Sequence, residues 1–333
     1  MEILEMLWNE IVNFFGIREF FQILSLGDYS SFLTYDGIVA LVLPIVPLLL
    51  ILEFIVGRAY KNPQTKVYQT AFLIYIFNRF IGRFVSLTMV AICIGIFQKY
   101  APFQTTMTWY WFIYGNIIWE LAHFVYHYLG HKVRLFWCLH ATHHTPEKMN
   151  LSVAHAHFFL EYPVSDVIRT SICIILGVSP DLLFMMMFIH GTYGFFIHAG
   201  ENLMEDGRMG FLNKLILTPS HHRVHHARNP LYIDTNYCNL LNIWDKVFKT
   251  YQDEQKEIDI EYGITRKINS GNFIDVYFGE FIALYKDVVK APGIKNKLGY
   301  IFNPPGWDHN GNHSTAKMIR DEYINQIQKK INN

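Results

Sequence analysis

Histidine is the residue type whose number and spacing stand out in this sequence. Of the 16 histidines, 14 lie between His123 and His226. Eight of these form one H-x3-H pair and two H-x2-H-H groups: His127 and His131, then His140, His143 and His144, then His222, His225 and His226. Residues three or four apart share one face of a helix, so each cluster directs its imidazoles to one side.

The chemistry that such clusters can do is metal coordination. Neutral imidazole is a ligand for iron, zinc, copper and nickel. A lone H-x3-H or an adjacent pair arises by chance in many helices, but three clusters with maintained spacing are a specific signal. Eight converging imidazoles would hold two ions. We therefore predict a two-metal centre and favour it over structural histidines.

Motifs for several other centres are absent from the sequence. There is no HExxH of a zinc peptidase, no GxGxxG of a dinucleotide site and no CxxCH for covalently attached haem. The cysteines are widely spaced and form no CxxC pair, which predicts buried free thiols at Cys93, Cys138, Cys173 and Cys238.

Two further histidines neighbour the clusters. His198 ends an apolar segment and is a candidate ninth ligand; the alternative, a helix-end histidine at the membrane interface, stays open. His221 precedes His222 by one residue and would point about 100° away on a helix. We therefore expect His221 to support the ligands rather than to bind metal.

Glu120 lies two helical turns before His127. We expect its carboxylate to accept the N–H of a ligand imidazole and so to fix the tautomer of that ring. An equally weighted alternative is a membrane-helix carboxylate paired with Arg79 or Arg83.

The rest of the chain is apolar and electrically balanced. Hydrophobic residues make up 51% of the 333 residues and charged residues 17%, and 28 basic residues match 28 acidic ones. This composition excludes a disordered chain. The lack of a long Lys/Arg block argues against nucleic acid as a partner.

Five apolar stretches predict an all-α, polytopic membrane protein. Residues 37–57, 70–97 and 107–128 each approach or exceed the ~20 residues of a spanning helix, and prolines are expected to kink the first. The second contains polar residues, and a buried soluble helix is its alternative. Residues 163–178 and 182–198 are shorter, so we expect a hairpin that enters the membrane and returns.

Changes in polarity predict four parts of the chain. The parts are an amphipathic or interfacial segment (1–36), a membrane domain with the first two clusters (37–200), a cytosolic, histidine-rich cap with the third (201–310) and a polar tail (311–333). The N-terminal segment lacks the basic start and the cleavage site of a secretory signal. Within the last two parts, residues 273–289 and 317–333 are expected to be helical.

Basic residues in the loops predict an orientation. They follow the first and third spans, at Arg58, Lys61, Lys66, Lys132, Arg134 and Lys148, whereas the loop between the second and third spans carries only Lys99. Under the positive-inside rule the clusters face the cytoplasm. We expect an integral multi-pass protein of a bacterial inner membrane or the endoplasmic reticulum.

The order of the three clusters resembles the fatty acid hydroxylase superfamily of membrane di-iron enzymes, also called the sterol desaturase family. Over about residues 105–253 the resemblance includes Glu120, Asn150 after the second cluster, and WDKVFKT at 244–250, which is similar to the family's WDRxFGT. The segment TPSHHRVHH at 218–226 looks closest to the alkylglycerol monooxygenase branch.

The resemblance implies an enzyme that hydroxylates a lipid C–H bond with two iron ions and O2, taking its lipid from the bilayer. In the alkylglycerol branch a tetrahydropterin supplies electrons and the carbon next to the ether oxygen is hydroxylated. The resulting hemiacetal falls apart to an aldehyde and a glycerol derivative. Other branches hydroxylate or desaturate fatty acyl chains, sphingoid bases or sterols, with electrons from an external redox protein.

Several positions depart from the family pattern. Tyr128 stands where the family has Arg, and Cys238 and Lys249 replace glycines of its NYG and FGT elements. These departures leave the metal ligands intact and leave the lipid and the reductant undetermined. Two other functions would also use the clusters: a dizinc hydrolase, and a metal-binding membrane transporter, whose ligands should lie inside the spans.

Overall fold

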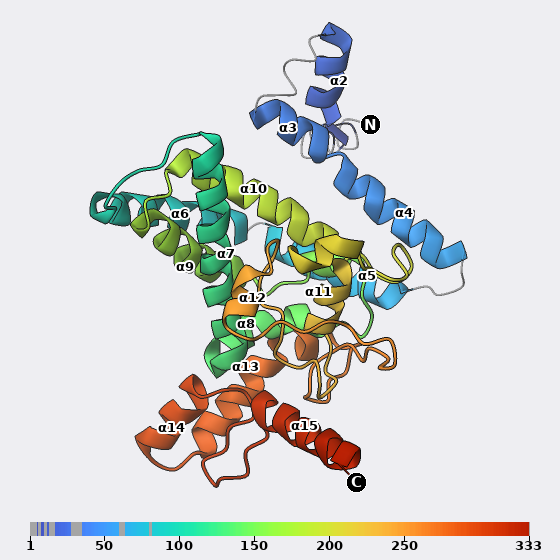
Figure 1. The fold of residues 1–333 in the computed structure, drawn as a ribbon, viewed down its shortest axis with the longest axis vertical. Helices are drawn as coiled ribbons and strands as arrows, with labels where there is room; N and C mark the ends of the chain where they lie inside the picture. Colours follow the sequence, from blue (N-terminus) through green and yellow to red (C-terminus); the bar gives the residue numbers. More distant parts are fainter. Residues whose placement is uncertain are drawn as a thin grey trace. The chain divides into compact units, whose positions relative to one another are not determined.

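The computed structural model describes residues 5, 8–9, 12, 17–27, 35–59, 64–79 and 82–332 (Figure 1). Within these residues all regular secondary structure is helical, apart from two isolated bridges, Ile216 with Leu241 and Ala227 with Tyr262. The predicted all-α class is therefore confirmed. Residues 1–63 and 64–333 form two compact units.

The first unit contains the most apolar helix of the chain. Its described elements are α2 (Ile17–Leu26), α3 (Tyr35–Val42) and α4 (Ile45–Ala59). A turn at Leu43 and Pro44 separates α3 from α4, as expected for a proline inside an apolar stretch. The helical segment Gly37–Ala59, which includes most of α3 and all of α4, is the one in the described part of the chain that is long and apolar enough to cross a bilayer. Of the expected amphipathic N-terminal segment, α2 is seen, and most of residues 1–16 lie outside the description.

The second unit begins with two helices where the sequence suggested one span over residues 70–97. These are α5 (Thr65–Arg79) and α6 (Gly82–Phe97), each shorter than the ~20 residues needed for a crossing. Near the end of α5, Asn78 bonds the carbonyl of His157 (2.6 Å) and the hydroxyl of Tyr277 (2.5 Å). The polar residue that interrupts the apolar stretch is thus used to attach α5 to later parts of the unit.

Four helices carry or surround the first two histidine clusters. They are α7 (Trp109–Lys132), α8 (Arg134–His144), α9 (Glu161–Ile175) and α10 (Pro180–Phe196). Apolar side chains of α6, α7, α9 and α10 form one core: Val90, Ile118, Trp119, Ala122, Cys173, Ile174, Leu182, Leu183 and Met186, with Val178 of the α9–α10 connection. The expected helical pair is confirmed, and Ser179 caps α10 through the backbone N–H of Leu182.

Residues after 200 form short helices and loops, followed by longer helices. The elements are η4 (Gly210–Lys214), α11 (Pro219–His225), α12 (Ile243–Val247), α13 (Phe273–Lys290), α14 (Gly293–Phe302) and α15 (Ala316–Asn332). Both helices expected from periodicity in this region, at 273–289 and 317–333, are confirmed. Tyr277 of α13 packs on Phe158 with a ring distance of 4.9 Å, which joins the C-terminal helices to the site-bearing part of the unit.

Candidate metal centre

Four helices bring nine buried histidines together. The end of α7 supplies His127 and His131, and α8 supplies His140, His143 and His144. His198 follows the C-terminus of α10, and α11 with its C-terminal cap supplies His222, His225 and His226. Each of the nine is at most 5% exposed, so their side chains are removed from solvent.

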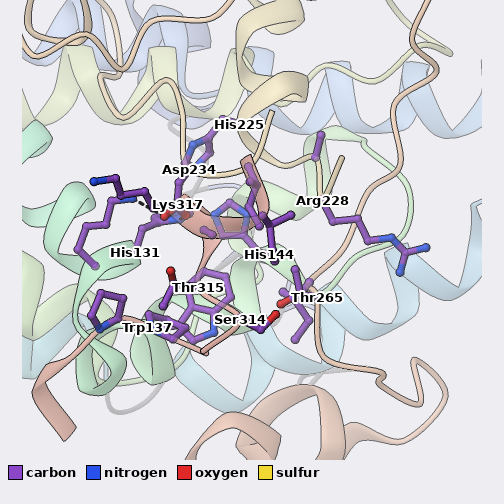
Figure 2. A pocket seen from close by; sticks show the side chains of 18 of the residues that line it. His131, Trp137, His144, His225, Arg228, Asp234, Thr265, Ser314, Thr315 and Lys317 are labelled. Atoms are coloured by element: carbon purple, nitrogen blue, oxygen red, sulfur yellow. Dashed lines mark hydrogen bonds and ion pairs between the residues drawn. The ribbon is translucent and has the colours of Figure 1, made fainter. Parts of the chain in front are cut away.

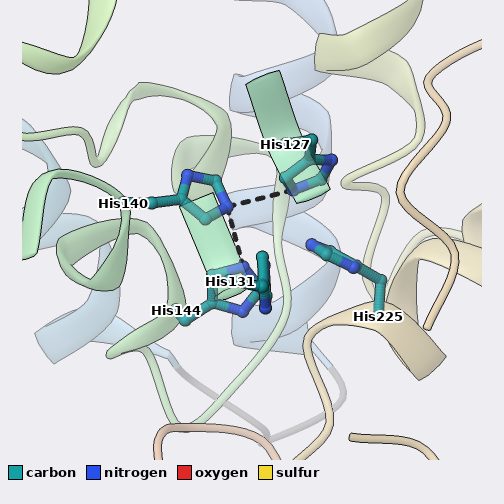
Figure 3. Close-up of side chains that lie close together, drawn as sticks. All are labelled: His127, His131, His140, His144 and His225. Carbon is teal, nitrogen blue, oxygen red and sulfur yellow. Dashed lines mark hydrogen bonds between the residues drawn. The ribbon is translucent and has the colours of Figure 1, made fainter. Parts of the chain in front are cut away.

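Five of these imidazoles form a first group (Figure 3). One ring nitrogen from each of His127, His131, His140, His144 and His225 lies within 4.8 Å of the others. Nε2 of His140 is 3.0 Å from Nε2 of His127 and 3.1 Å from Nε2 of His144. Nε2 of His131 and Nε2 of His225 are buried and have no hydrogen-bond partner among the described residues.

The other four imidazoles form a second group: His143, His198, His222 and His226. Nε2 of His198 is 2.9 Å from Nε2 of His222 and 3.2 Å from Nε2 of His143. Its Nδ1 donates to the carbonyl of Gly194 at 2.5 Å. The structure therefore places the candidate ninth ligand among the cluster histidines. The two groups adjoin, because the rings of His144 and His226 stack with centroids 4.3 Å apart.

The tautomers of the first group follow from the partners of Nδ1. Carbonyl and carboxylate oxygens only accept hydrogen bonds, so an Nδ1 that contacts one must donate. Four rings have such a partner at 2.6–3.2 Å: His127 with Tyr237 O, His131 with Asp234, His140 with Glu161 and His225 with Thr235 O. In a neutral ring the lone pair is then on Nε2 and faces the neighbouring Nε2 atoms.

Burial favours the neutral form of His144, His225 and His226. Loss of solvent, together with the neighbouring imidazoles, holds the pKa of His144 and of His226 well below the usual value. The pKa of His225 is also well below it, mainly through burial. Neutral imidazole is the form that binds metal, and facing Nε2 lone pairs repel one another unless a cation lies between them. The donor set thus fits two transition-metal ions.

Glu161 orients imidazoles of the centre, and the sequence did not predict this role. Its fully buried carboxylate accepts from Nδ1 of His140 (2.6 Å), Nδ1 of His157 (2.8 Å) and the hydroxyl of Tyr126 (3.1 Å). Burial alone would raise its pKa, but His157 and His140 hold the pKa of Glu161 well below its usual range. In the sequence, the feature that could have indicated this role is a single acidic residue at the start of an apolar helix.

Residues 234–237 supply three more anchors that the sequence did not assign. Asp234 pairs with Nδ1 of His131 and with Lys132, while Thr235 and Tyr237 present carbonyls to His225 and His127. Asp234 and Asn236 have positive φ angles of 61° and 59°, a conformation that Asp and Asn tolerate better than most residues. This backbone conformation directs the Asp234 carboxylate and the carbonyls of Thr235 and Tyr237 toward the imidazoles.

Glu120 does not have the expected imidazole partner among the nine histidines. It accepts from the backbone N–H groups of residues 239–241 at 2.5–3.0 Å and lies 3.2 Å from Nδ1 of His190. Seven residues of helix separate Glu120 from His127 by about 10 Å along the axis, which explains the difference. The side chains of Arg79 and Arg83, the alternative partners, lie outside the described residues.

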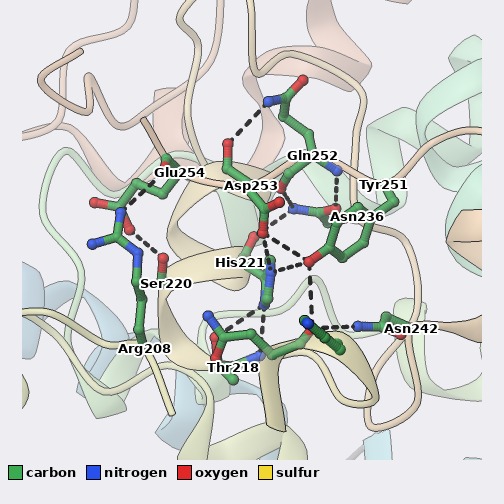
Figure 4. A network of polar contacts seen from close by, with 12 residues as sticks. Arg208, Thr218, Ser220, His221, Asn236, Asn242, Tyr251, Gln252, Asp253 and Glu254 are labelled. Atoms are coloured by element: carbon green, nitrogen blue, oxygen red, sulfur yellow. Dashed lines mark hydrogen bonds and ion pairs between the residues drawn. The ribbon is translucent and has the colours of Figure 1, made fainter. Parts of the chain in front are cut away.

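His221 and Asn150 contact groups other than the nine imidazoles. His221 caps α11 with Thr218 and contacts the Tyr251 hydroxyl (2.7 Å) and Asp253 (3.0 Å) (Figure 4), and it belongs to neither imidazole group. The buried Asn150 bonds Gln64 (2.6 Å) and caps the short helix η3 (Leu151–His155). Both residues position segments that carry or adjoin the candidate ligands.

Two cavities open onto the histidines. The first cavity, of about 360 Å³, touches His131, His144 and His225; the rest of its lining mixes polar residues, including Thr265, Ser314, Thr315 and Lys317, with apolar ones (Figure 2). The second cavity, of about 330 Å³, touches both groups through His127, His140, His143, His198 and His222 and lies among α7, α9 and α10. The centre is thus accessible from two sides.

Comparison with known proteins agrees with the predicted resemblance. Residues 112–250 match the family model named Fatty acid hydroxylase. Alkylglycerol monooxygenase from Homo sapiens is 34% identical over 206 residues, which cover 62% of this chain and 44% of that protein. The Xenopus tropicalis enzyme of the same name is 30% identical over 266 residues, covering 78% and 57%.

A bacterial relative is more distant. Ornithine lipid hydroxylase OlsE from Rhizobium tropici is 24% identical over 159 residues, covering 48% of this chain and 47% of that protein. The chain spans about half the length of the curated relatives it matches. No solved structure matches the chain.

Glu161→Gln is expected to weaken metal binding about 10- to 100-fold, because the amide cannot accept from both imidazoles as the carboxylate does. Metal content after dialysis against graded chelator measures the effect. Glu147→Gln, at an exposed position beyond the second cluster, is the matched control and should retain metal like the parent. Equal retention by both variants would contradict the supporting role of Glu161.

Asp245→Ala is expected to destabilise the detergent-solubilised protein by about 1–3 kcal/mol, because buried N–H groups lose their acceptor. The carboxylate of Asp245 accepts from the N–H groups of Tyr237 and Cys238, both at 2.8 Å. Thermal unfolding measures the change, with exposed Asp259→Ala as the control. An unchanged midpoint for Asp245→Ala would exclude this role.

Proposed function

Since residues 112–250 carry a fatty acid hydroxylase domain, we propose that the chain is an O2-dependent lipid monooxygenase with two iron ions. The observation that carries the proposal is the pair of adjoining imidazole groups whose Nε2 atoms face one another in a buried site. His127, His131, His140, His144 and His225 would hold one ion, and His143, His198, His222 and His226 the other.

Iron is the metal that the proposed reaction requires. Unactivated C–H bonds resist acids, bases and nucleophiles, and bound iron supplies the redox chemistry that zinc lacks. The histidines would hold the ions, and Glu161, Asp234 and the carbonyls of residues 235 and 237 keep four of the rings in place. The buried walls exclude water from the reacting carbon.

Each of the two cavities would bind one reactant, the lipid or the electron donor. The second cavity lies among α7, α9 and α10, the helices that the sequence places at the membrane, and would receive the lipid. The first cavity has the charged residues Lys132, Asp234 and Lys317 in its lining, and would receive the reductant. Its volume suits a small molecule such as a tetrahydropterin; a redox protein is the other donor that the family uses.

The relatives named alkylglycerol monooxygenase support an ether lipid as substrate. One oxygen atom of O2 enters the C–H bond next to the ether oxygen, and two electrons and two protons reduce the other to water. The hemiacetal then separates into an aldehyde and a glycerol derivative. The ornithine lipid hydroxylase relative favours a second candidate, in which a hydroxylated lipid is itself the product.

We also propose a multi-pass membrane location with the histidines facing the cytoplasm. The 23-residue helix Gly37–Ala59 and exposed apolar side chains on α5 and α6, such as Phe72 and Phe84, support membrane contact. The basic residues of the loops support the orientation.

The purified chain is expected to bind about two iron atoms and to consume O2 only with lipid and reductant present. His143→Ala and His225→Ala, one from each group, should each lower iron content and abolish lipid oxidation, because each removes a candidate ligand. Elemental analysis and product mass spectrometry measure both effects. His313→Ala, in a loop of the C-terminal part, is the control. Full iron content and activity in both ligand variants, or activity with zinc alone, would refute the proposal.

A further inference from the structure

The second cavity is lined by polar groups that the proposed metal centre does not use. Trp119 and His123 come from α7, and Arg169 comes from α9. In each of them one nitrogen is buried and has no hydrogen-bond partner in the described structure: Nε1 of Trp119, Nδ1 of His123 and Nε of Arg169. Buried polar groups are normally paired, and a buried indole N–H usually finds an acceptor. Three such nitrogens on one cavity point to a polar ligand.

These groups form one cluster. The guanidinium of Arg169 lies over the ring of Trp119, 5.4 Å from its centroid, and 5.9 Å from that of Tyr126. The same cavity is lined by His127, His143 and His222. A ligand bound by the cluster is therefore close to both imidazole groups.

The charges around the cluster select the kind of ligand. Arg169 already donates to Asp166 and to Ser165, each at 2.7 Å, so its positive charge is balanced. Glu161 adds a second buried carboxylate to the same cavity. Around the cluster itself, apart from the proposed metal ions, a phosphate or carboxylate would meet two acidic groups and one basic group. Hydroxyl and ether oxygens can accept from the indole and guanidinium N–H groups without adding charge.

We propose that Trp119, His123 and Arg169 form a head-group site for a lipid whose polar head is neutral and carries hydroxyl or ether oxygens. The proposal rests on the function proposed above and adds the residues that choose the substrate. Because the head is held in the cavity that touches the metal ligands, the oxidised carbon lies near the head and not far along the chain.

The location of the head is tested by cross-linking on the full iron-loaded chain in detergent. The probe is a 1-O-alkylglycerol with a photoreactive diazirine on its glycerol. Label that unlabelled alkylglycerol competes away is expected on peptides containing residues 119–126 or 162–169. Competed label on residues 304–319 of the first cavity, elsewhere in the chain, or nowhere would overturn the proposal. This readout needs no turnover, so it is separate from the test of activity.

Substrate discrimination tests the individual residues. The parent is expected to favour 1-O-hexadecylglycerol over hexadecyl propyl ether, which lacks the hydroxyls, about tenfold or more in kcat/KM. Trp119→Phe and Arg169→Gln should each remove most of this preference, through KM for the glycerol lipid, at unchanged iron content. Arg208→Gln, which lines neither cavity, is the control and should keep it.

A purely structural role of these residues would lower kcat/KM for both lipids equally, and that result would overturn the head-group site. So would a preference unchanged in both variants. If the parent chain neither binds iron nor oxidises lipid, the proposed function is refuted. The cross-linking result would still show where the lipid head group binds.

Discussion

The arrangement of the second unit depends on one electrostatic constraint, the convergence of unprotonated Nε2 atoms in a buried space. Neutral imidazoles with their proton on Nδ1 repel one another when their Nε2 lone pairs meet at about 3 Å. A cation between them turns this repulsion into attraction. The protein must hold each ring against rotation, and it does so at the opposite nitrogen, where a carbonyl or carboxylate accepts Nδ1–H in five of the nine rings.

This constraint explains why an irregular segment lies at the centre of a helical protein. Helix carbonyls are already engaged within their own helix, so most ring-orienting carbonyls come from residues 234–237, where the backbone leaves regular structure. Asp245 and Glu120 then bind the N–H groups of residues 237–241 and keep the segment in place. Glu120 acts on the centre through this backbone.

The same arrangement leaves the centre open on two sides of different character. The first cavity is lined by loops and the C-terminal part, with Lys132, Asp234 and Lys317, and the second lies among α7, α9 and α10, which share an apolar core. An enzyme that joins a lipid with a polar reductant needs both kinds of access, because neither reactant partitions easily into the environment of the other. The polar groups of Trp119 and Arg169 inside the helix-lined cavity match a substrate that is itself amphipathic.

The sequence by itself determined the helical class, the helices expected at 273–289 and 317–333, and the eight cluster histidines, because helical periodicity is local and H-x2-H-H spacing places its rings on one face. Only the tertiary structure showed how the rings divide into two groups. It placed His198 in the second group and His221 in neither. It alone showed Glu161 and residues 234–237 as ring anchors, and it gave Glu120 a backbone partner instead of an imidazole. These contacts join residues up to 121 positions apart, and their geometry depends on how helices pack and not on spacing along the chain.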